Sequence, residues 1–275
     1  MDIAASGLSD MRLGAIVSSN SRGLARLASR VSSGKRITSA ADDAAGLGVA
    51  STLDAQVRST RTAIRNAQDG IALIEVADTA AGEVTNALQR MRALAVQAGS
   101  SFLTTSARSV LDLEFSGMRS EISRISDSVT FNGRSLANGS MPVLSVQVGI
   151  GASSNSRVGI RLGRLTATQL GLTAANVDLL TESNARSSID VIDSALQSVS
   201  STRSRLGATV NRIEASIGAS QGFRDALAAA GGRLVDADYA KETSEFAKAQ
   251  ILMVAGGASM LHHRRIEQQA LRLLS

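Results

Sequence analysis

The stretch that decides the fold is LASRVSSGKRITSAADDAAGLGVAS, residues 27–51. Within it, the helical pattern of the preceding residues breaks at Ser32-Ser33-Gly34, and a glycine is typical of a helix C-terminus. Asp42 and Asp43 follow, and acidic residues at such a place favour the start of a new helix. The stretch therefore predicts a helix, a short connector and a second helix, with Gly34, Asp42 and Asp43 as the connector residues.

The helix before this break, expected over about residues 6–33, carries one apolar stripe. Its members recur at steps of four and three, which is the spacing of a heptad seam. They are Leu13, Val17, Asn20, Leu24, Leu27 and Val31. Asn20 is the polar exception, and a buried Asn at such a position fixes register at a cost in stability.

Long helices are also expected further along the chain. One should run from about residue 43 to 98, and its length, roughly 84 Å at ~1.5 Å per residue, requires partner helices beside it. A third follows residue 106, with apolar residues stepping 4-3-4-3-4 from Leu111 to Val129. A fourth shows a 3-4 seam from Ile189 to Ile217, interrupted at Arg203, and should end or loosen at Gly231-Gly232.

The region between the third and fourth helices has a different period. Residues 143–148 alternate with period two and favour a strand, and 158–162 form a second candidate strand, with turn signals at Asn132-Gly133 and Asn138-Gly139. Two short strands are too few for a sheet domain, so we expect a β-hairpin region near 130–165 at the end of the helical rod. Residues 166–182 are expected to be mostly loop.

The last helix is expected over about residues 236–273. Its larger apolar residues lie seven residues apart. They are Tyr239, Phe246, Met253 and Met260. The fold class predicted from these patterns is therefore mainly α, with long antiparallel helices forming a coiled-coil rod, a helix at each terminus and a small β-hairpin region.

Composition and charge exclude several functional classes. The 275 residues include no Cys, no Trp, one Tyr and one Pro, so disulfides and thiol chemistry are excluded and a large aromatic core is not expected. The net charge of +5 is small, and the arginines are spread along helices, so we expect no nucleic-acid binding. The longest apolar run, residues 251–261, is too short to cross a membrane. We expect no membrane insertion.

Catalytic and metal-binding constellations are not found in the sequence. His262 and His263 are the only histidines, and neighbours on a helix point about 100° apart, which is poor geometry for two metal ligands. We find no pairing of a nucleophile with a base. The sequence predicts no enzyme activity, no metal and no cofactor.

The sequence closely resembles the bacterial flagellins, the subunits of the flagellar filament. Matching motifs occur near both termini in the right order and cover about two-thirds of the chain. They are RLASRVSSGKRITSAADDAAGLGVAS (26–51), NAQDGIALIEVADTAAGEV (66–84), LQRMRALAVQA (88–98), TFNGRSL (130–136), IDVIDSALQSVSSTRSRLGATVNRIEASI (189–217) and DADYAKETSEFAKAQILMVAG (236–256). No single motif decides the matter, but the set is very specific.

The resemblance implies an organisation in two domains. Residues 1–42 and 232–275 would form a terminal helical domain, the inner tube of the filament, disordered in the monomer. Residues 43–231 would form the rod. Because only about fifty residues, 130–182, separate the third and fourth helices, the chain resembles a minimal flagellin without the variable outer domain. The subunit interface is expected along the first-helix stripe and along Tyr239, Phe246, Met253 and Met260.

The resemblance also implies a route and a set of partners. Flagellins leave the cell without a cleaved signal peptide, through the flagellar type III channel, and fold at the filament tip to become extracellular. The implied partners are other copies of the chain in a helical homopolymer, the filament cap and hook-associated proteins, and an export chaperone at the C-terminal helix. A hook–filament junction or other flagellar adaptor protein is the alternative function, although the short middle region argues against it.

A surface read by a Toll-like receptor is a further property of the family. Arg90, Leu94 and Gln97 match its motif, whereas Ala93 stands where the family usually has Glu. The alternative for Arg90 and Leu94 is a purely structural role at the tube interface, and we favour that alternative.

Overall fold

The computed structural model describes residues 3–274, and the chain divides into two compact units. One unit comprises residues 1–57 and 225–275, and the other comprises residues 58–224. Most of the described residues are helical, so the predicted mainly α class is confirmed. These bounds differ from the expected domains, 1–42 with 232–275 and 43–231, whose division by role stays a prediction.

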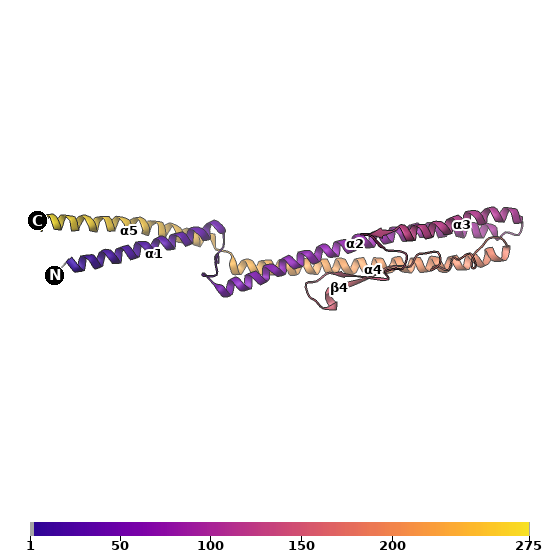
Figure 1. Cartoon of the computed structure of the whole chain (residues 1–275), viewed down its shortest axis with the longest axis horizontal. Helices are drawn as coiled ribbons and strands as arrows, with labels where there is room; N and C mark the ends of the chain where they lie inside the picture. The colour runs from indigo at the N-terminus through magenta and orange to yellow at the C-terminus, as the bar shows by residue number, and fades with distance from the viewer. Residues whose placement is uncertain (1–2, 275) are drawn as a thin grey trace. The chain divides into compact units, whose positions relative to one another are not determined.

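In the unit made of the two chain ends, helix α1 (Ile3–Ser33) packs along helix α5 (Tyr239–Leu274). The helices are antiparallel, so the two termini lie at the same end of the pair (Figure 1). The register follows from two places: Gly14 lies beside the Met260 side chain, and Arg30 lies beside Glu242. Small residues in both helices, among them Gly14 and Gly256, allow this close approach.

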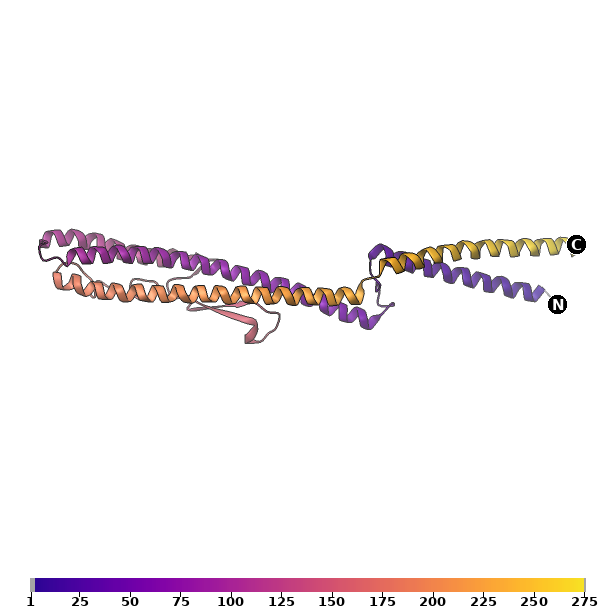
Figure 2. The same ribbon diagram turned by 180° about the vertical axis from the view of Figure 1, so that it is seen from behind.

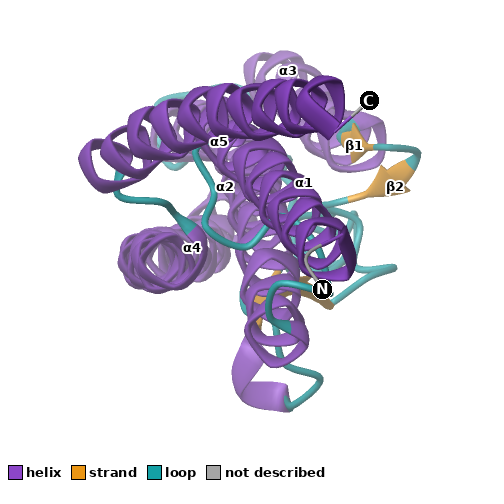
Figure 3. Ribbon diagram, turned by 90° about the vertical axis from the view of Figure 1, so that its left-hand side faces the viewer, coloured by secondary structure: helices purple, strands orange, loops and turns teal. Residues whose placement is uncertain are grey.

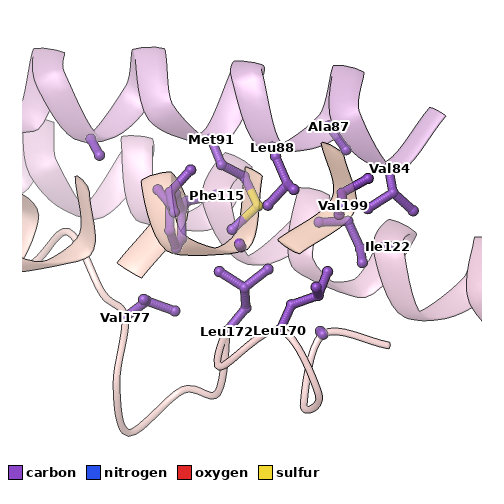
Figure 4. Packing of buried hydrophobic residues seen from close by; sticks show 14 of the residues in the cluster. Val84, Ala87, Leu88, Met91, Phe115, Ile122, Leu170, Leu172, Val177 and Val199 are labelled. Carbon is purple, nitrogen blue, oxygen red and sulfur yellow. The ribbon is translucent and has the colours of Figure 1, made fainter. Parts of the chain in front are cut away.

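The other unit is built on α2 (Ala44–Ala98), α3 (Thr105–Ser128) and α4 (Glu182–Val235). Within residues 58–224, α2 and α4 run side by side, and α3 lies along the part of α2 that precedes the α2–α3 turn (Figures 1 and 2). Figure 4 shows how α2, α3, α4 and the segment before α4 share one core, with Met91 and Phe115 near its centre. This unit holds nearly the whole buried apolar core of the described chain.

Short antiparallel strands complete this unit (Figure 3). Strands β1 (Thr130–Phe131) and β2 (Arg134–Ser135) form a two-residue ladder, and β3 (Val143–Gln147) pairs with β4 (Arg157–Arg161), with Val143 opposite Arg161. The period-two pattern thus predicted both strands of the larger hairpin. A short 3-10 turn, Ser154–Ser156, precedes β4.

The sequence led us to expect the larger hairpin at the end of the rod, but the hairpin does not lie there. It shares a second core with residues 67–77 of α2 and with Leu206 and Ile213 of α4. Gly70 of α2 makes room for it, because a Cβ there would lie 3.1 Å from the Val146 side chain. The helices therefore extend past the hairpin in both directions, and the hairpin covers the side of the α2–α4 pair.

Two bidentate ion pairs fix the register of α2 against α4. Arg92 donates to both carboxylate oxygens of Asp193 at 2.7 and 3.2 Å, and Arg203 donates to those of Asp78 at 2.8 and 3.1 Å. The hydrogen bond from Arg92 lowers the pKa of the Asp193 carboxyl, and the bond to Asp78 raises the pKa of Arg203. Arg203, which interrupted the predicted seam, is therefore an exposed partner of α2.

The buried line of α4 is shifted from the predicted seam. Four predicted positions are buried, namely Ile192, Val199, Leu206 and Ile213. The other buried residues on this line are small, Ser188, Ala195, Thr202 and Thr209, and each stands one position before the predicted Ile189, Leu196, Arg203 and Val210. The helix also continues through Gly231-Gly232 to Val235, so the expected end at these glycines is wrong. The glycines are tolerated inside the helix, at a cost of up to ~1 kcal/mol each relative to alanine.

Candidate assembly surface

The connector between α1 and α2 is held to the end of α4 by backbone pairing. Gly34 adopts φ +67°, the left-handed conformation that glycine takes without strain after a helix. Lys35 pairs with Asp236 in an antiparallel bridge, and the Arg36 amide donates to the Val235 carbonyl at 2.7 Å. The Arg36 guanidinium also donates to the Leu234 carbonyl, at 2.7 Å. The predicted connector is therefore a turn whose backbone is hydrogen-bonded to the chain where α4 ends.

The two predicted aspartates have separate tasks in this turn. Asp42 accepts hydrogen bonds from the amide and hydroxyl groups of both Thr38 and Ser39, at 2.9 to 3.2 Å. These bonds, with the Thr38 hydroxyl first, hold the pKa of the Asp42 carboxyl below its usual value. Asp43 accepts from the Gly46 amide at 2.8 Å and so caps the start of α2. Gly46 leaves room for this contact, because a Cβ there would crowd the Asp43 carboxylate and the Ile37 side chain.

An ion cluster joins the connector to both terminal helices. Arg30 of α1 lies between the Asp42 carboxylate, at 3.8 Å, and the Glu242 carboxylate, at 3.7 Å. Glu242 is buried, although it stands only three residues into α5. Asp238 begins α5 by accepting from the amides of Ala240 and Lys241. Opposite charges at the end of α1 and the start of α5 therefore lie together in this register.

The predicted stripe of α1 faces α5, but it is only partly covered. All six of its residues, Leu13, Val17, Asn20, Leu24, Leu27 and Val31, are half-buried. On α5 the same holds for Phe246, Met253 and Met260. Of the buried apolar residues in the described chain, only Ile37 and Val57 belong to this unit. Two helices packed on each other give a contact line and no enclosed core.

Tyr239 departs from the predicted α5 stripe. It is 61 % exposed, whereas Glu242, three residues later, takes the inward position at this end of the helix. The seven-residue spacing of the predicted set is correct for a heptad, but Tyr239 is the first residue of α5, where the connector still directs the chain. Its assignment to a subunit interface stays a prediction.

A second apolar stripe on α5 was missed in the sequence. Ile251, Val254 and Leu261 are 64 to 69 % exposed. Ile251 stands two residues before Met253, about 200° round the helix, so this stripe points away from α1. Its i, i+3, i+10 spacing is helical and could have been found in the sequence. Since exposed apolar stripes mark sites of association, α5 carries one apolar face toward α1 and another that nothing in this unit covers.

Of the three residues that match the receptor motif, two lie on the surface and one lies in the core. Arg90 is exposed and pairs with Glu114 of α3, its Nε donating at 2.7 Å, and Gln97 is exposed. Leu94 is 1 % exposed and packs in the core beside α3 and α4, so its side chain is not part of that surface. Arg90 and Leu94 thus stabilise the helical unit, and recognition by a receptor stays a prediction.

The described residues form neither a metal site nor a membrane span. In the part of the chain that the structure describes, no three carboxylate or histidine side chains gather as metal ligands would. No helix among residues 3–274 has the length and apolar character needed to cross a bilayer.

Comparison with protein families gives two matches that together span most of the chain. Residues 8–141 match the model of the bacterial flagellin N-terminal helical region, and residues 189–274 match that of the C-terminal helical region. The first match contains most of α1 and the α1–α2 connector, and the second contains α5, so the matched ranges include most of the unit made of the two chain ends.

Individual relatives agree over almost their whole length. The chain is 38 % identical to the flagellin of Halalkalibacterium halodurans over 245 residues, which are 89 % of each chain. It is 34 % identical to the flagellin of Bacillus subtilis over 289 aligned positions, covering 94 % of this chain and 95 % of the relative.

Among solved structures, a protein assigned as a flagellar hook-associated protein of Vibrio parahaemolyticus superposes with a TM-score of 0.60 at 16 % identity, over 71 % of this chain and all of the other. That likeness concerns the fold alone.

Proposed function

Because this chain belongs to the bacterial flagellin family, we propose that it is exported unfolded and completes its folding as it joins the tip of a flagellar filament. Flagellins are structural subunits of the extracellular filament and associate with copies of themselves. The proposal adds to this family role an account of why polymerisation and folding are coupled in this chain.

The observation that carries the proposal is the contrast between the two units. Residues 58–224 enclose two apolar cores, whereas the pairing of α1 with α5 leaves the apolar residues of its contact line half-exposed. Folding must repay roughly 1–2 kcal/mol of backbone entropy per residue, and apolar burial is the main source of that energy. A pair of helices without an enclosed core gains little, so neighbouring subunits would have to cover the remaining apolar surface.

This imbalance suits export through a narrow channel. A terminal unit that gains little from its own packing opens at small cost, so this part of the chain can enter a channel as an extended polymer. At the filament tip, burial of the α1–α5 contact line and of the outer α5 stripe would offset the conformational entropy that the terminal helices lose on ordering. Each added subunit would present a new uncovered surface, so growth continues by heterologous association.

The same surface suggests where the partners act. Before export, the outer stripe Ile251, Val254 and Leu261 would be open to premature association, and we propose that a chaperone covers it. Hook-associated proteins and the filament cap would meet the terminal helices at the two ends of the polymer. These partners are proposed from the family.

The test is seeded polymerisation of the purified full-length chain, followed by electron microscopy. We expect micrometre-long filaments from the full chain and none from chains lacking residues 1–33 or 236–275. Circular dichroism should show that both shortened chains keep the helices of residues 58–224, because their cores lie outside the deletions. An adaptor present in few copies would give no filaments even from the full chain, and filaments from either shortened chain would contradict the proposal.

A further inference from the structure

Phe102 has the most exposed side chain among the large apolar residues that the structure describes. It is 86 % exposed and lies in the turn between α2 and α3, far along the chain from the terminal unit. Of the other phenylalanines, Phe115 is fully buried in the first core and Phe131 packs against the second. An aromatic ring held in water gains nothing for the fold, so its position needs another explanation.

The turn that carries Phe102 is rigidly held. Arg108 of α3 is 9 % exposed, and its guanidinium donates to the carbonyls of Ala98, Ser100 and Leu103 at 2.9, 2.8 and 3.0 Å. Phe102 therefore lies between two residues whose carbonyls are tied to the same buried cation. Thr104 also caps α3, through the Ala107 amide. The backbone positions the ring in solvent, as expected of a preorganised anchor that fills a pocket on a partner.

A suitable hollow lies at the opposite end of the same unit. Its volume is about 280 Å³, and its apolar lining comes from Ala63 of α2, Ile150 after β3 and Phe223 of α4. Ile150 and Phe223 are 43 and 48 % exposed, so the hollow is open to solvent. An apolar cavity of roughly 150 Å³ is enough to hold benzene, and this one therefore has room for a phenyl ring.

The charges at the two ends of the unit are complementary. Residues 96–115 and 173–190, around the α2–α3 turn, contain five acidic and two basic residues. Residues 58–70, 145–161 and 209–224, around the hollow, contain seven basic and two acidic residues. Opposite charge fixes the orientation of an encounter and disfavours like ends meeting. The natural occupant of the hollow is thus the α2–α3 turn of a second copy of this chain.

We propose that Phe102 of one subunit inserts into the Ala63–Ile150–Phe223 hollow of the next, so that the 58–224 units stack head to tail. The inference rests on the proposed function and names one of its subunit contacts. A contact between different surfaces on equivalent copies repeats without limit when its rotation does not close a ring. Along α2, the 35 steps from Ala63 to Ala98 span roughly 52 Å at ~1.5 Å per residue, so the two surfaces lie far apart on one subunit.

Cysteine cross-linking tests the contact, because the chain has no cysteine of its own. Filaments of a Phe102→Cys/Ile150→Cys double variant, oxidised and run on a denaturing gel, should give a ladder of covalent oligomers, since bridged cysteines need Cα atoms about 4.4–6.8 Å apart. A Phe102→Cys/Val143→Cys variant is the matched control, because Val143 is exposed on the same hairpin but does not line the hollow. Filaments with no ladder, or with equal ladders in both variants, would overturn the contact.

A second measurement applies whether or not the cysteine variants polymerise. Phe102→Ser should raise the critical concentration for seeded assembly by roughly ten-fold or more, from the loss of one buried aromatic side chain per contact. Leu113→Ser, which alters a 74 % exposed residue of α3, should change it less than three-fold. An unchanged critical concentration for Phe102→Ser, in the presence of normal wild-type filaments, would refute this contact and leave the proposed function standing. Failure of the wild-type chain to polymerise would instead refute the proposed function.

Discussion

Replacing Arg108 by methionine tests how far one buried cation stabilises the end of the 58–224 unit. The aliphatic part of the side chain is kept, and the three hydrogen bonds to the Ala98, Ser100 and Leu103 carbonyls are lost. A hydrogen bond to a charged group contributes about 1.5–3 kcal/mol. The Ser100 and Leu103 carbonyls lie in a turn that water can reach, so part of the loss is recovered. We expect the free energy of unfolding to fall by about 2–4 kcal/mol.

Urea unfolding of the monomer, followed by far-ultraviolet circular dichroism, measures this loss. With a slope of about 2 kcal/mol per molar urea, the midpoint should fall by about 1–2 M. The control is Arg124→Met on the same helix, where an exposed i, i+3 pair with Glu121 is removed and a change under ~1 kcal/mol is expected. Equal midpoints for the wild type and Arg108→Met would show that the turn does not depend on Arg108.

Two further predictions concern the connector. Gly34→Val should impair filament assembly, while Gly34→Asn and Ser29→Ala should assemble nearly normally. No atom would crowd a Cβ at position 34, so only the φ of +67° strains a β-branched residue there, by ~1 kcal/mol or more. Equal motility of cells carrying the valine and asparagine variants would contradict this prediction. Hydrogen bonds from Thr38 and Ser39 hold the pKa of the folded-state Asp42 carboxyl below its usual value of 3.8, so its contribution to stability is present above that pH and is lost as the pH falls through the folded pKa. In the filament, exchange of the Thr38 and Ser39 amides should rise below about pH 3.8 relative to the reference exchange rate at each pH, and in Asp42→Ala it should be fast already at pH 6. Wild-type protection in that variant would show that Asp42 does not hold the turn.

Much of the fold follows from local sequence. The break at Gly34, the heptad steps and the period-two segment at 143–148 correspond to the helix and strand bounds, because capping, heptad repeats and strand alternation act over a few residues. Residues 166–181 show where this fails. They lack regular structure, yet Leu170, Leu172, Val177 and Leu179 are buried against α2, α3 and α4. Nothing local distinguishes such a segment from a solvent-exposed loop.

The surface was less predictable than the core. The sequence indicated which residues of α1 and α5 face each other, because two antiparallel helices must align their apolar stripes. It did not indicate that Glu242 would replace Tyr239 at the inward position, since that depends on Arg30 arriving from α1. Phe102 was not singled out, because its exposure results from a turn that Arg108 organises from six residues away. Such features need the tertiary structure.

The central claim is that the terminal helices are completed by neighbouring subunits, and hydrogen exchange of monomer against filament tests it most directly. We predict that in the monomer the amides of α1 and α5 exchange fast while those around Phe115 and Ile122 are protected. In the filament, α1 and α5 should gain protection of at least a hundred-fold, equivalent to roughly 2.7 kcal/mol or more, with little change around Ile122. Monomers in which α1 and α5 are already as protected as the Phe115–Ile122 region, or filaments in which they gain nothing, would contradict the account.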